Sequence, residues 1–299
     1  MNEAKDTVGV VGLGIMGSSI ARNIAERQTK VVGFDVDPKI ADALRANGIE
    51  ILPSPAAVAE RADLVLLSLP SVGALDEVVS GATGLTRNAR PSLVVAELST
   101  LPIAAKERSR DALARSGATL LDCPLSGTGA QARTRDLIVY ASGDEAACRR
   151  CVPFFDKFSK ATHYLGPFGD GMKMKFVANL LVTIHNVAAA EALVMAEKCG
   201  LDPGLVYRVI TSGGAASSRM FEVRGPLMVD GKYEPVTMKN EVYQKDLALI
   251  AEFAAKNASP TPLFSASLPL YAATIAQGMG LKDTAAVHAV LARMAGIER

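Results

Sequence analysis

The chain has 299 residues, of which 49% are hydrophobic and 21% are charged. This composition is typical of a compact globular protein with room for two filled cores, and it excludes an intrinsically disordered chain. With 32 basic and 31 acidic residues the net charge is +1, which gives no electrostatic basis for binding nucleic acid or an anionic membrane. We therefore expect neither partner.

Cysteine use and hydropathy indicate the compartment. Four cysteines in a chain of this length favour a reducing environment. Cys148 and Cys151 have C-x-x-C spacing, but no second pair completes a zinc site, so we interpret them as ordinary helix residues and expect no metal. The polar start MNEAKDT predicts no signal peptide. The apolar stretch 176–196 contains Asn179 and Asn186, which favours a buried helix over a membrane span. The expected location is cytoplasmic.

The first half of the chain alternates short apolar runs with helical patterns. Continuous apolar runs are typical of strands buried on both faces, and they occur at 8–11, 31–34, 63–70, 92–97, 119–122, 137–141 and 163–165. Helical patterns lie between them, for example up to residue 27 and at 38–47, 55–61 and 102–116. Strands and helices that alternate with short connections predict an α/β fold with a Rossmann-type, doubly wound parallel sheet.

The composition changes after a cluster of glycine and proline at 166–171. Helical patterns rich in Ala, Leu and Met follow at 172–199, 203–212, 240–256, 265–277 and 283–295. We predict a dinucleotide-binding Rossmann domain at 1–167 and an all-α C-terminal domain for substrate binding and dimerisation at 168–299. The second domain has more apolar helix surface than a small domain usually buries, so we expect a homodimer or a homotetramer.

A dinucleotide fingerprint follows the first apolar run. Residues 12–17 fit G-x-G-x-x-G, in a strand–turn–helix context. The first glycine allows a tight turn, the second lets the backbone approach the pyrophosphate, and the third allows close packing of helix and strand. The helix N-terminus supplies N–H donors. The predicted contacts with the cofactor are Gly12, Leu13, Gly14, Ile15, Met16 and Gly17.

Asp35 indicates which dinucleotide binds. It lies 23 residues after Gly12, near the spacing of about 20 expected for a ribose-binding carboxylate. A carboxylate there accepts hydrogen bonds from the ribose hydroxyls and repels a 2′-phosphate. Asp37 adds a second negative charge, and no arginine occurs in 34–39. We predict that NAD is preferred and that NADP is the less favoured cofactor.

The predicted helix at 172–199 carries a polar stripe. Lys175, Asn179, Thr183 and Asn186 recur at spacings of four, four and three, so they share one face. A buried polar stripe is costly unless its groups are hydrogen-bonded. Substrate and water in a cleft would satisfy it, or the stripe could meet solvent or a neighbouring loop. The spacing alone leaves both interpretations open.

Further short motifs follow the fingerprint in a fixed order. They are Leu69-Pro70, Ser99-Thr100, Asp122-x-Pro124-x-Ser126-Gly127, Gly169-x-Gly171-x-x-x-Lys175-x-x-x-Asn179, Lys245-Asp246-Leu247 and Gly278-x-Gly280-x-x-Asp283. In this order, and over essentially the whole chain, the sequence resembles the β-hydroxyacid dehydrogenase family. That family includes 3-hydroxyisobutyrate dehydrogenases, tartronate semialdehyde reductases and, more distantly, 6-phosphogluconate dehydrogenase.

The resemblance implies reversible hydride transfer between a nicotinamide and a small β-hydroxyacid. Lys175 would be the general acid and base, and Asn179 would hold its amine or the substrate oxygen. The substrate carboxylate would meet Ser126, Gly127 and Thr128. The other implied contacts with the cofactor are Leu69, Pro70, Thr100 and Lys245.

The chain departs from the family pattern at two places. Ala178 stands where members have the first asparagine of an Asn-Asn pair. Thr128, Gln131 and Arg135 stand where members have glycine in the substrate loop. The added side chains should reshape the pocket, so the substrate stays open among 3-hydroxyisobutyrate, a tartronate semialdehyde/glycerate couple, a serine- or threonine-like acid and a larger acid.

Two other functions are compatible with a dinucleotide fold: an imine-reducing relative on the same scaffold, and a non-catalytic dinucleotide-binding module. Lys175 argues against both, because an amine acid–base group suits a hydroxyacid couple and a non-catalytic module would not need it. A serine hydrolase is unsupported, since G-x-S-x-G does not occur. Arg219 could enter a cleft, but a surface position is favoured. The pattern assigns no role to Arg133.

Overall fold

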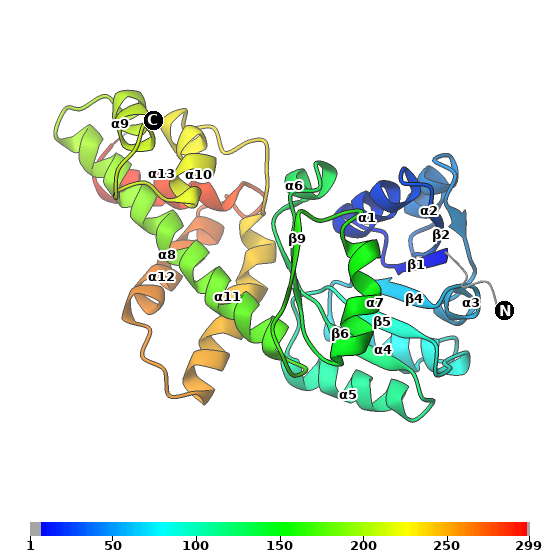
Figure 1. The fold of residues 1–299 in the computed structure, drawn as a ribbon. Helices are drawn as coiled ribbons and strands as arrows, with labels where there is room; N and C mark the ends of the chain where they lie inside the picture. Colours follow the sequence, from blue (N-terminus) through cyan, green and yellow to red (C-terminus); the bar gives the residue numbers. More distant parts are fainter. Residues whose placement is uncertain (1–6, 298–299) are drawn as a thin grey trace. The chain divides into compact units, whose positions relative to one another are not determined.

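The computed structural model describes residues 7–297, apart from the side chain of Ala41. The chain forms two compact units, which divide between Lys175 and Phe176 (Figure 1). The division lies inside helix α8 (Asp170–Lys198), a few residues after the boundary expected at 167.

The first unit contains a six-stranded sheet with all strands parallel. Its strand order is β3-β2-β1-β4-β5-β6, so the direction of winding reverses between β1 and β4. This order is that of a Rossmann fold, and the predicted fold class is confirmed. The strands are β1 (Thr7–Val11), β2 (Lys30–Phe34), β3 (Glu50–Ile51), β4 (Leu64–Leu67), β5 (Val94–Glu97) and β6 (Thr119–Asp122).

Helices cover both faces of this sheet and create two cores. Alternate residues of β4 face opposite sides: Leu64 and Leu66 belong to the core that includes α1, while Val65 and Leu67 belong to the core that includes α3 and α4. Three helices begin at a serine or aspartate that caps the first turn: Asp37, Ser54 and Ser71. The helices are α1 (Ile15–Ala25), α2 (Pro38–Arg45), α3 (Pro55–Arg61), α4 (Val72–Ser80) and α5 (Ile103–Ala114), with a 3₁₀ turn at Leu85–Arg87.

The strands predicted at 137–141 and 163–165 belong to a second, three-stranded sheet rather than to the first. It consists of β7 (Leu125–Ser126), β8 (Ile138–Ala141) and β9 (Ala161–Tyr164), with β7 antiparallel to β8 and β8 parallel to β9. Only Cys123 and Pro124 separate β6 from β7, and Asp122 at the end of β6 forms an antiparallel bridge to Ser142 in the same register as the pair Leu125–Val139. Strand β7 therefore continues the direction of β6, and the chain reverses only between β7 and β8. Helices α6 (Gly129–Arg133) and α7 (Glu145–Phe155) lie between these strands in sequence.

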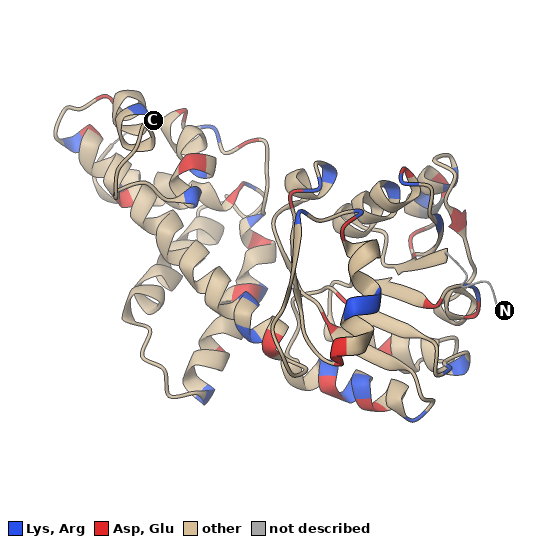
Figure 2. Ribbon diagram, in the orientation of Figure 1, with Lys and Arg blue, Asp and Glu red and all other residues tan. Residues whose placement is uncertain are grey.

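The second unit is helical, as predicted. Its long helix α8 has no Lys, Arg, Asp or Glu between residues 176 and 190 (Figure 2). In length and composition α8 could cross a membrane, but the core helix of a soluble protein meets the same criteria. Thr183 and Asn186 on α8 are fully buried and hydrogen-bonded to other helices of this unit, as in a core helix. Those helices are α9 (Pro203–Thr211), α10 (Arg219–Val229), α11 (Asn240–Lys256), α12 (Pro262–Ala276) and α13 (Val287–Met294), with a 3₁₀ turn at Thr284–Ala286.

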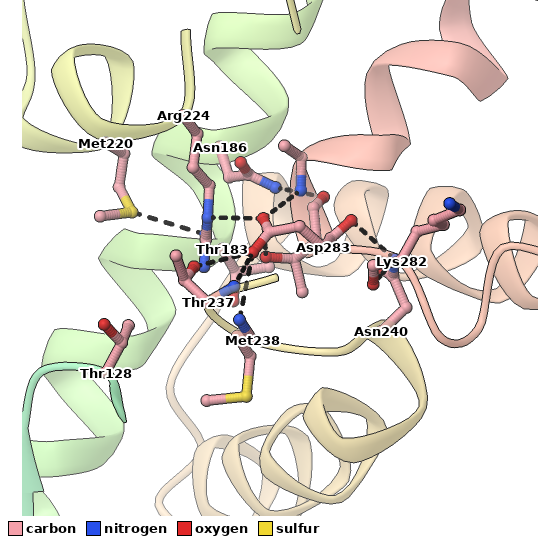
Figure 3. Close-up of polar contacts among 12 residues, drawn as sticks. Thr128, Thr183, Asn186, Met220, Arg224, Thr237, Met238, Asn240, Lys282 and Asp283 are labelled. Atoms are coloured by element: carbon pink, nitrogen blue, oxygen red, sulfur yellow. Dashed lines mark hydrogen bonds and ion pairs between the residues drawn. The ribbon is translucent and has the colours of Figure 1, made fainter. Parts of the chain in front are cut away.

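Asp283 joins several segments of the second unit (Figure 3). Its Oδ2 accepts from the backbone N–H of Thr237 at 2.7 Å and of Met238 at 3.1 Å. Its Oδ1 accepts from the N–H of Ala285 at 2.9 Å and lies 3.3 Å from Nε of Arg224. Burial acts to raise the pKa of Asp283, but Arg224 and the hydrogen-bond donors outweigh it and lower the pKa. The aspartate of the motif at 278–283 is therefore a structural centre of this unit.

Candidate active site

The glycine fingerprint forms a compact turn between β1 and α1. Gly12 has φ +86°, and a Cβ there would overlap the Ser68 carbonyl oxygen. A Cβ on Gly17 would overlap the carbonyl oxygen of Gly12. At Gly14 a Cβ would meet no atom of the protein within 4 Å, and no side chain caps α1 there. The open space and uncapped N–H groups fit a dinucleotide pyrophosphate. Leu13, Ile15 and Met16 complete the turn.

Asp35 lies beside this turn, directly after β2. Its Oδ2 accepts from the N–H of Leu13 at 2.6 Å, and its Oδ1 accepts from the N–H of Asp37 at 2.8 Å. An ionised carboxylate has about four lone-pair sites, so it can also accept from ribose hydroxyls. The arrangement fits a ribose at this end of the glycine turn.

The predicted cofactor loops after β4 and β5 are hydrogen-bonded to each other. The N–H of Leu69 donates to Oγ of Ser99 at 2.7 Å, and the N–H of Ser99 donates to Oε1 of Glu97 at 3.0 Å. Pro70 is exposed and Thr100 is half-buried. Because β4 and β5 follow β1 in the parallel sheet, both loops leave the same edge as the glycine turn.

The predicted substrate loop has internal hydrogen bonds that the sequence did not indicate. Ser126, Gly127 and Thr128 are half-buried, and Gly127 has φ +131°. The backbone N–H of Thr128 donates to Oε1 of Gln131 at 3.0 Å, within a capping box that begins α6. The Thr128 N–H is thus engaged inside the loop, and the backbone donor expected there for a substrate carboxylate already has a partner.

Lys175 and Asn179 lie one turn apart on α8, and each is 8% exposed. Nδ2 of Asn179 donates to Oδ2 of Asp246 on α11 at 3.0 Å. Asp246 is buried and orients the Asn179 amide, a role that the sequence pattern did not indicate although the residue lies in the Lys245-Asp246-Leu247 motif. Lys245 itself is exposed on α11, in the second unit, so its contact with the cofactor stays a prediction.

The rest of the polar stripe is hydrogen-bonded within the second unit, apart from the buried Oδ1 of Asn186, which has no hydrogen-bond partner among the described residues. The hydroxyl of Thr183 lies 2.8 Å from that of Tyr243 and donates to the Asn179 carbonyl at 2.8 Å. Nδ2 of Asn186 donates to the Tyr271 hydroxyl at 3.0 Å. The end of the stripe at Thr183 and Asn186 therefore meets buried tyrosines, which neither of the two interpretations anticipated.

The other features that the sequence singled out are the pair Cys148 and Cys151, a possible metal site and Arg219. Burial raises the pKa of Cys148 to about 11 and that of Cys151 to about 12, so both are inert thiols near neutral pH. Among residues 7–297 no group of three or more His, Cys, Asp or Glu could hold a metal ion. Arg219 is exposed and pairs with Glu222 at 3.1 Å, as the favoured surface interpretation predicts.

Both units match models of known families. Residues 7–166 match the NAD binding domain of 6-phosphogluconate dehydrogenase. Residues 169–291 match a model described as the NAD-binding domain of NADP-dependent 3-hydroxyisobutyrate dehydrogenase. The chain belongs to the β-hydroxyacid dehydrogenase family.

Individual relatives agree over nearly the full length of the chain. The 2-hydroxy-3-oxopropionate reductase of Escherichia coli is 31% identical and covers 96% of this chain and 98% of its own. The L-threonate dehydrogenase of the same organism is 30% identical and covers 94% and 93%. The crystal structure of a 3-hydroxyisobutyrate dehydrogenase from Salmonella typhimurium is 30% identical, covers 95% and 99%, and superposes with a TM-score of 0.83. The predicted class, an NAD(P)-dependent oxidoreductase of hydroxyacids, is confirmed.

The glycine turn generates a paired prediction. Gly14→Ala should keep wild-type thermal stability but weaken NAD binding at least ~10-fold, because the new methyl group occupies open space near the helix N-terminus. Gly17→Ala should lower the melting temperature as well, since its Cβ overlaps the Gly12 carbonyl oxygen. Calorimetric titration with NAD and thermal denaturation measure both effects. Wild-type NAD affinity in Gly14→Ala would show that the dinucleotide does not approach this turn.

Proposed function

We propose that the protein is an NAD-preferring dehydrogenase of a small β-hydroxyacid, with Lys175 as its general acid and base. One observation carries the proposal: the buried lysine of the family's catalytic motif lies one turn before Asn179 on α8. The side chain of Asn179 is held by its hydrogen bond to Asp246, so the amide has a defined orientation on α8. A preorganised amine and amide suit a reaction that moves one proton.

In oxidation, the neutral amine of Lys175 takes the proton of the substrate hydroxyl. In reduction, its ammonium returns a proton to the forming alkoxide. Asn179 donates through Nδ2 to Asp246, which leaves Oδ1 as the acceptor that can face the lysine or the substrate hydroxyl. The Ser126 hydroxyl and the Gly127 backbone bind the substrate carboxylate. The nicotinamide, when bound, exchanges hydride with the carbinol carbon.

The relatives narrow the substrate to a class. The relatives are dehydrogenases or reductases of threonate, 2-hydroxy-3-oxopropionate and 3-hydroxyisobutyrate. The loop of this chain differs from the family pattern at Thr128, Gln131 and Arg135. The Gln131 amide fills space and engages the Thr128 N–H. We therefore propose a small hydroxyacid other than 3-hydroxyisobutyrate as the preferred substrate.

The proposal also includes a homo-oligomeric assembly and a cytoplasmic location. Apolar side chains are exposed on α8, with Val177, Leu181 and Met195 at 54%, 47% and 73%. A homodimer or a homotetramer would cover such residues. A cytoplasmic enzyme fits a chain whose four cysteines are free thiols.

The first prediction of this function concerns Lys175. Lys175→Ala should keep NAD affinity but lose turnover by at least ~10²-fold, as expected for a missing general acid–base group. Lys175→Arg should lose almost as much, because a guanidinium does not release its proton near neutrality. Asn179→Ala should be milder, since the proton carrier remains. The measurement is steady-state kinetics with whichever of the three named acids the wild type turns over fastest. Near-wild-type turnover in Lys175→Ala would contradict the assignment.

The second prediction concerns the cofactor. Wild-type protein should bind NAD more tightly than NADP, because the Asp35 carboxylate repels a 2′-phosphate. The double variant Asp35→Ser, Val36→Arg should reverse this preference, since Val36 is 87% exposed and its replacement can reach solvent beside the ribose site. Val36→Arg alone is the control and should still favour NAD. Equal or tighter NADP binding by the wild type would refute the proposal.

The third prediction concerns the substrate loop. Gln131→Gly should raise kcat/KM for 3-hydroxyisobutyrate by ~10-fold or more, because it releases the Thr128 N–H and empties the space of one side chain. Thr134→Gly is the matched control, since Thr134 is exposed in the same segment and makes no hydrogen bond to Thr128 in the structure described. Wild-type oxidation of 3-hydroxyisobutyrate at ~10⁴ M⁻¹s⁻¹ or above would show that the loop does not disfavour it.

A further inference from the structure

The first unit contains a fully buried lysine that the proposed mechanism does not use. Lys106, on α5, places its Nζ 2.6 Å from Oε2 of Glu97 and 2.7 Å from Oδ1 of Asp122. Glu97 and Asp122 end the neighbouring strands β5 and β6 and lie opposite each other in the sheet register. Two carboxylates so placed repel each other, and the ammonium between them offsets the repulsion.

The lysine stays charged in this position. Burial acts to lower the pKa of Lys106, but the two adjacent carboxylates outweigh burial and raise it. A buried charge with two ion-paired partners is costly to remove, because each carboxylate would lose its counter-charge. The ammonium therefore fixes the orientation of both acidic side chains.

One branch of this cluster leads to the cofactor loops. Glu97 accepts from the N–H of Ser99 through Oε1, while its Oε2 faces Lys106. Oγ of Ser99 in turn accepts from the N–H of Leu69. A rotation of the Glu97 carboxylate would therefore displace the loop that precedes Pro70.

The other branch leads to the start of α8. Oδ2 of Asp122 accepts from the N–H of Met172 at 2.8 Å, while its Oδ1 faces Lys106. Oγ of Ser142 accepts from the N–H of Gly171 at 2.9 Å and donates to the Asp122 carbonyl at 3.1 Å. The first turn of α8 is thus anchored on β6, and Lys175 follows Met172 by three residues, less than one helical turn.

Gly171, at this anchor, has no room for a side chain. A Cβ on Gly171 would lie 2.5 Å from the Tyr140 carbonyl oxygen and 2.8 Å from that of Asp122. The cluster carries two negative charges and one positive charge, so one negative charge remains. The partial positive charge at the N-terminal end of α8 interacts favourably with this remaining negative charge. Helix and carboxylates therefore stabilise one another.

We propose that Lys106 is a positioning residue. It holds the Asp122 carboxylate, which anchors the first turn of α8 and so fixes the position of the Lys175 amine. Through Glu97 it also holds the cofactor loop, so that the amine and this loop keep a constant relative position. The role rests on the proposed acid–base function of Lys175. Small displacements of a proton-transferring group reduce turnover steeply without a matching loss of binding.

The test replaces the ammonium with an apolar chain. Lys106→Met should lower kcat by ~10²-fold while NAD affinity changes less than about threefold. The primary deuterium isotope effect from the carbinol C–H should rise, because the chemical step becomes fully rate-limiting. A purely structural role would reduce the folded fraction but leave kcat per NAD-binding site and the isotope effect unchanged.

A second variant covers the case in which Lys106→Met does not fold. Ser142→Ala keeps all three charges and removes only the hydroxyl that anchors Gly171, and it should lower kcat by ~10-fold with a raised isotope effect. Lys157→Met is the control: its Nζ donates to Oγ1 of Thr29 at 2.6 Å, just before β2, which β1 and β4 separate from β5 and β6. It should keep the wild-type kcat and isotope effect.

The outcomes separate this proposal from the function on which it rests. If Lys175→Ala keeps its turnover, the acid–base assignment falls, and the positioning role with it. If Lys175→Ala loses turnover but a folded Lys106→Met keeps wild-type kcat and isotope effect, the positioning role alone is overturned. If Lys106→Met does not fold, wild-type values in Ser142→Ala overturn it.

Discussion

The carboxylate of Asp122 is the constraint on which the first unit depends. One oxygen faces the Lys106 ammonium at 2.7 Å, and the other accepts from the first turn of α8 at 2.8 Å. Because the group is fully buried, water cannot replace either partner. Strand β6, helix α5 and helix α8 meet at a single side chain, so none of these ends can shift without breaking a charged contact.

The glycine turn between β1 and α1 depends on a different constraint, which is steric. Gly12 and Gly17 lie where any side chain would collide with a backbone oxygen, whereas Gly14 faces open space. The same residue type thus serves two purposes in one turn: two glycines let the protein pack against itself, and one leaves room for a ligand. The Asp35 carboxylate, which accepts a hydrogen bond from the N–H of Leu13, is held against that turn.

What could be predicted from the sequence is what depends on near neighbours along the chain. The glycine turn and the strand–helix alternation are local patterns, and the structure has both. The partners of the polar stripe could not be predicted, because Tyr243 lies 60 residues from Thr183 and Tyr271 lies 85 from Asn186. Lys106 begins the charged run 106–110, which is typical of an exposed helix face, and only the pairing of β5 with β6 creates its buried site.

Arg135 shows how a backbone path and the residues on it can change independently. Its φ is +60°, a conformation that glycine adopts freely and other residues adopt at a cost of roughly 1–2 kcal/mol. The family pattern has glycine at this place in the motif, and here a long cation occupies a backbone conformation that suits glycine. A loop of this kind can therefore gain new side chains, and with them new contacts, without a change in its backbone conformation.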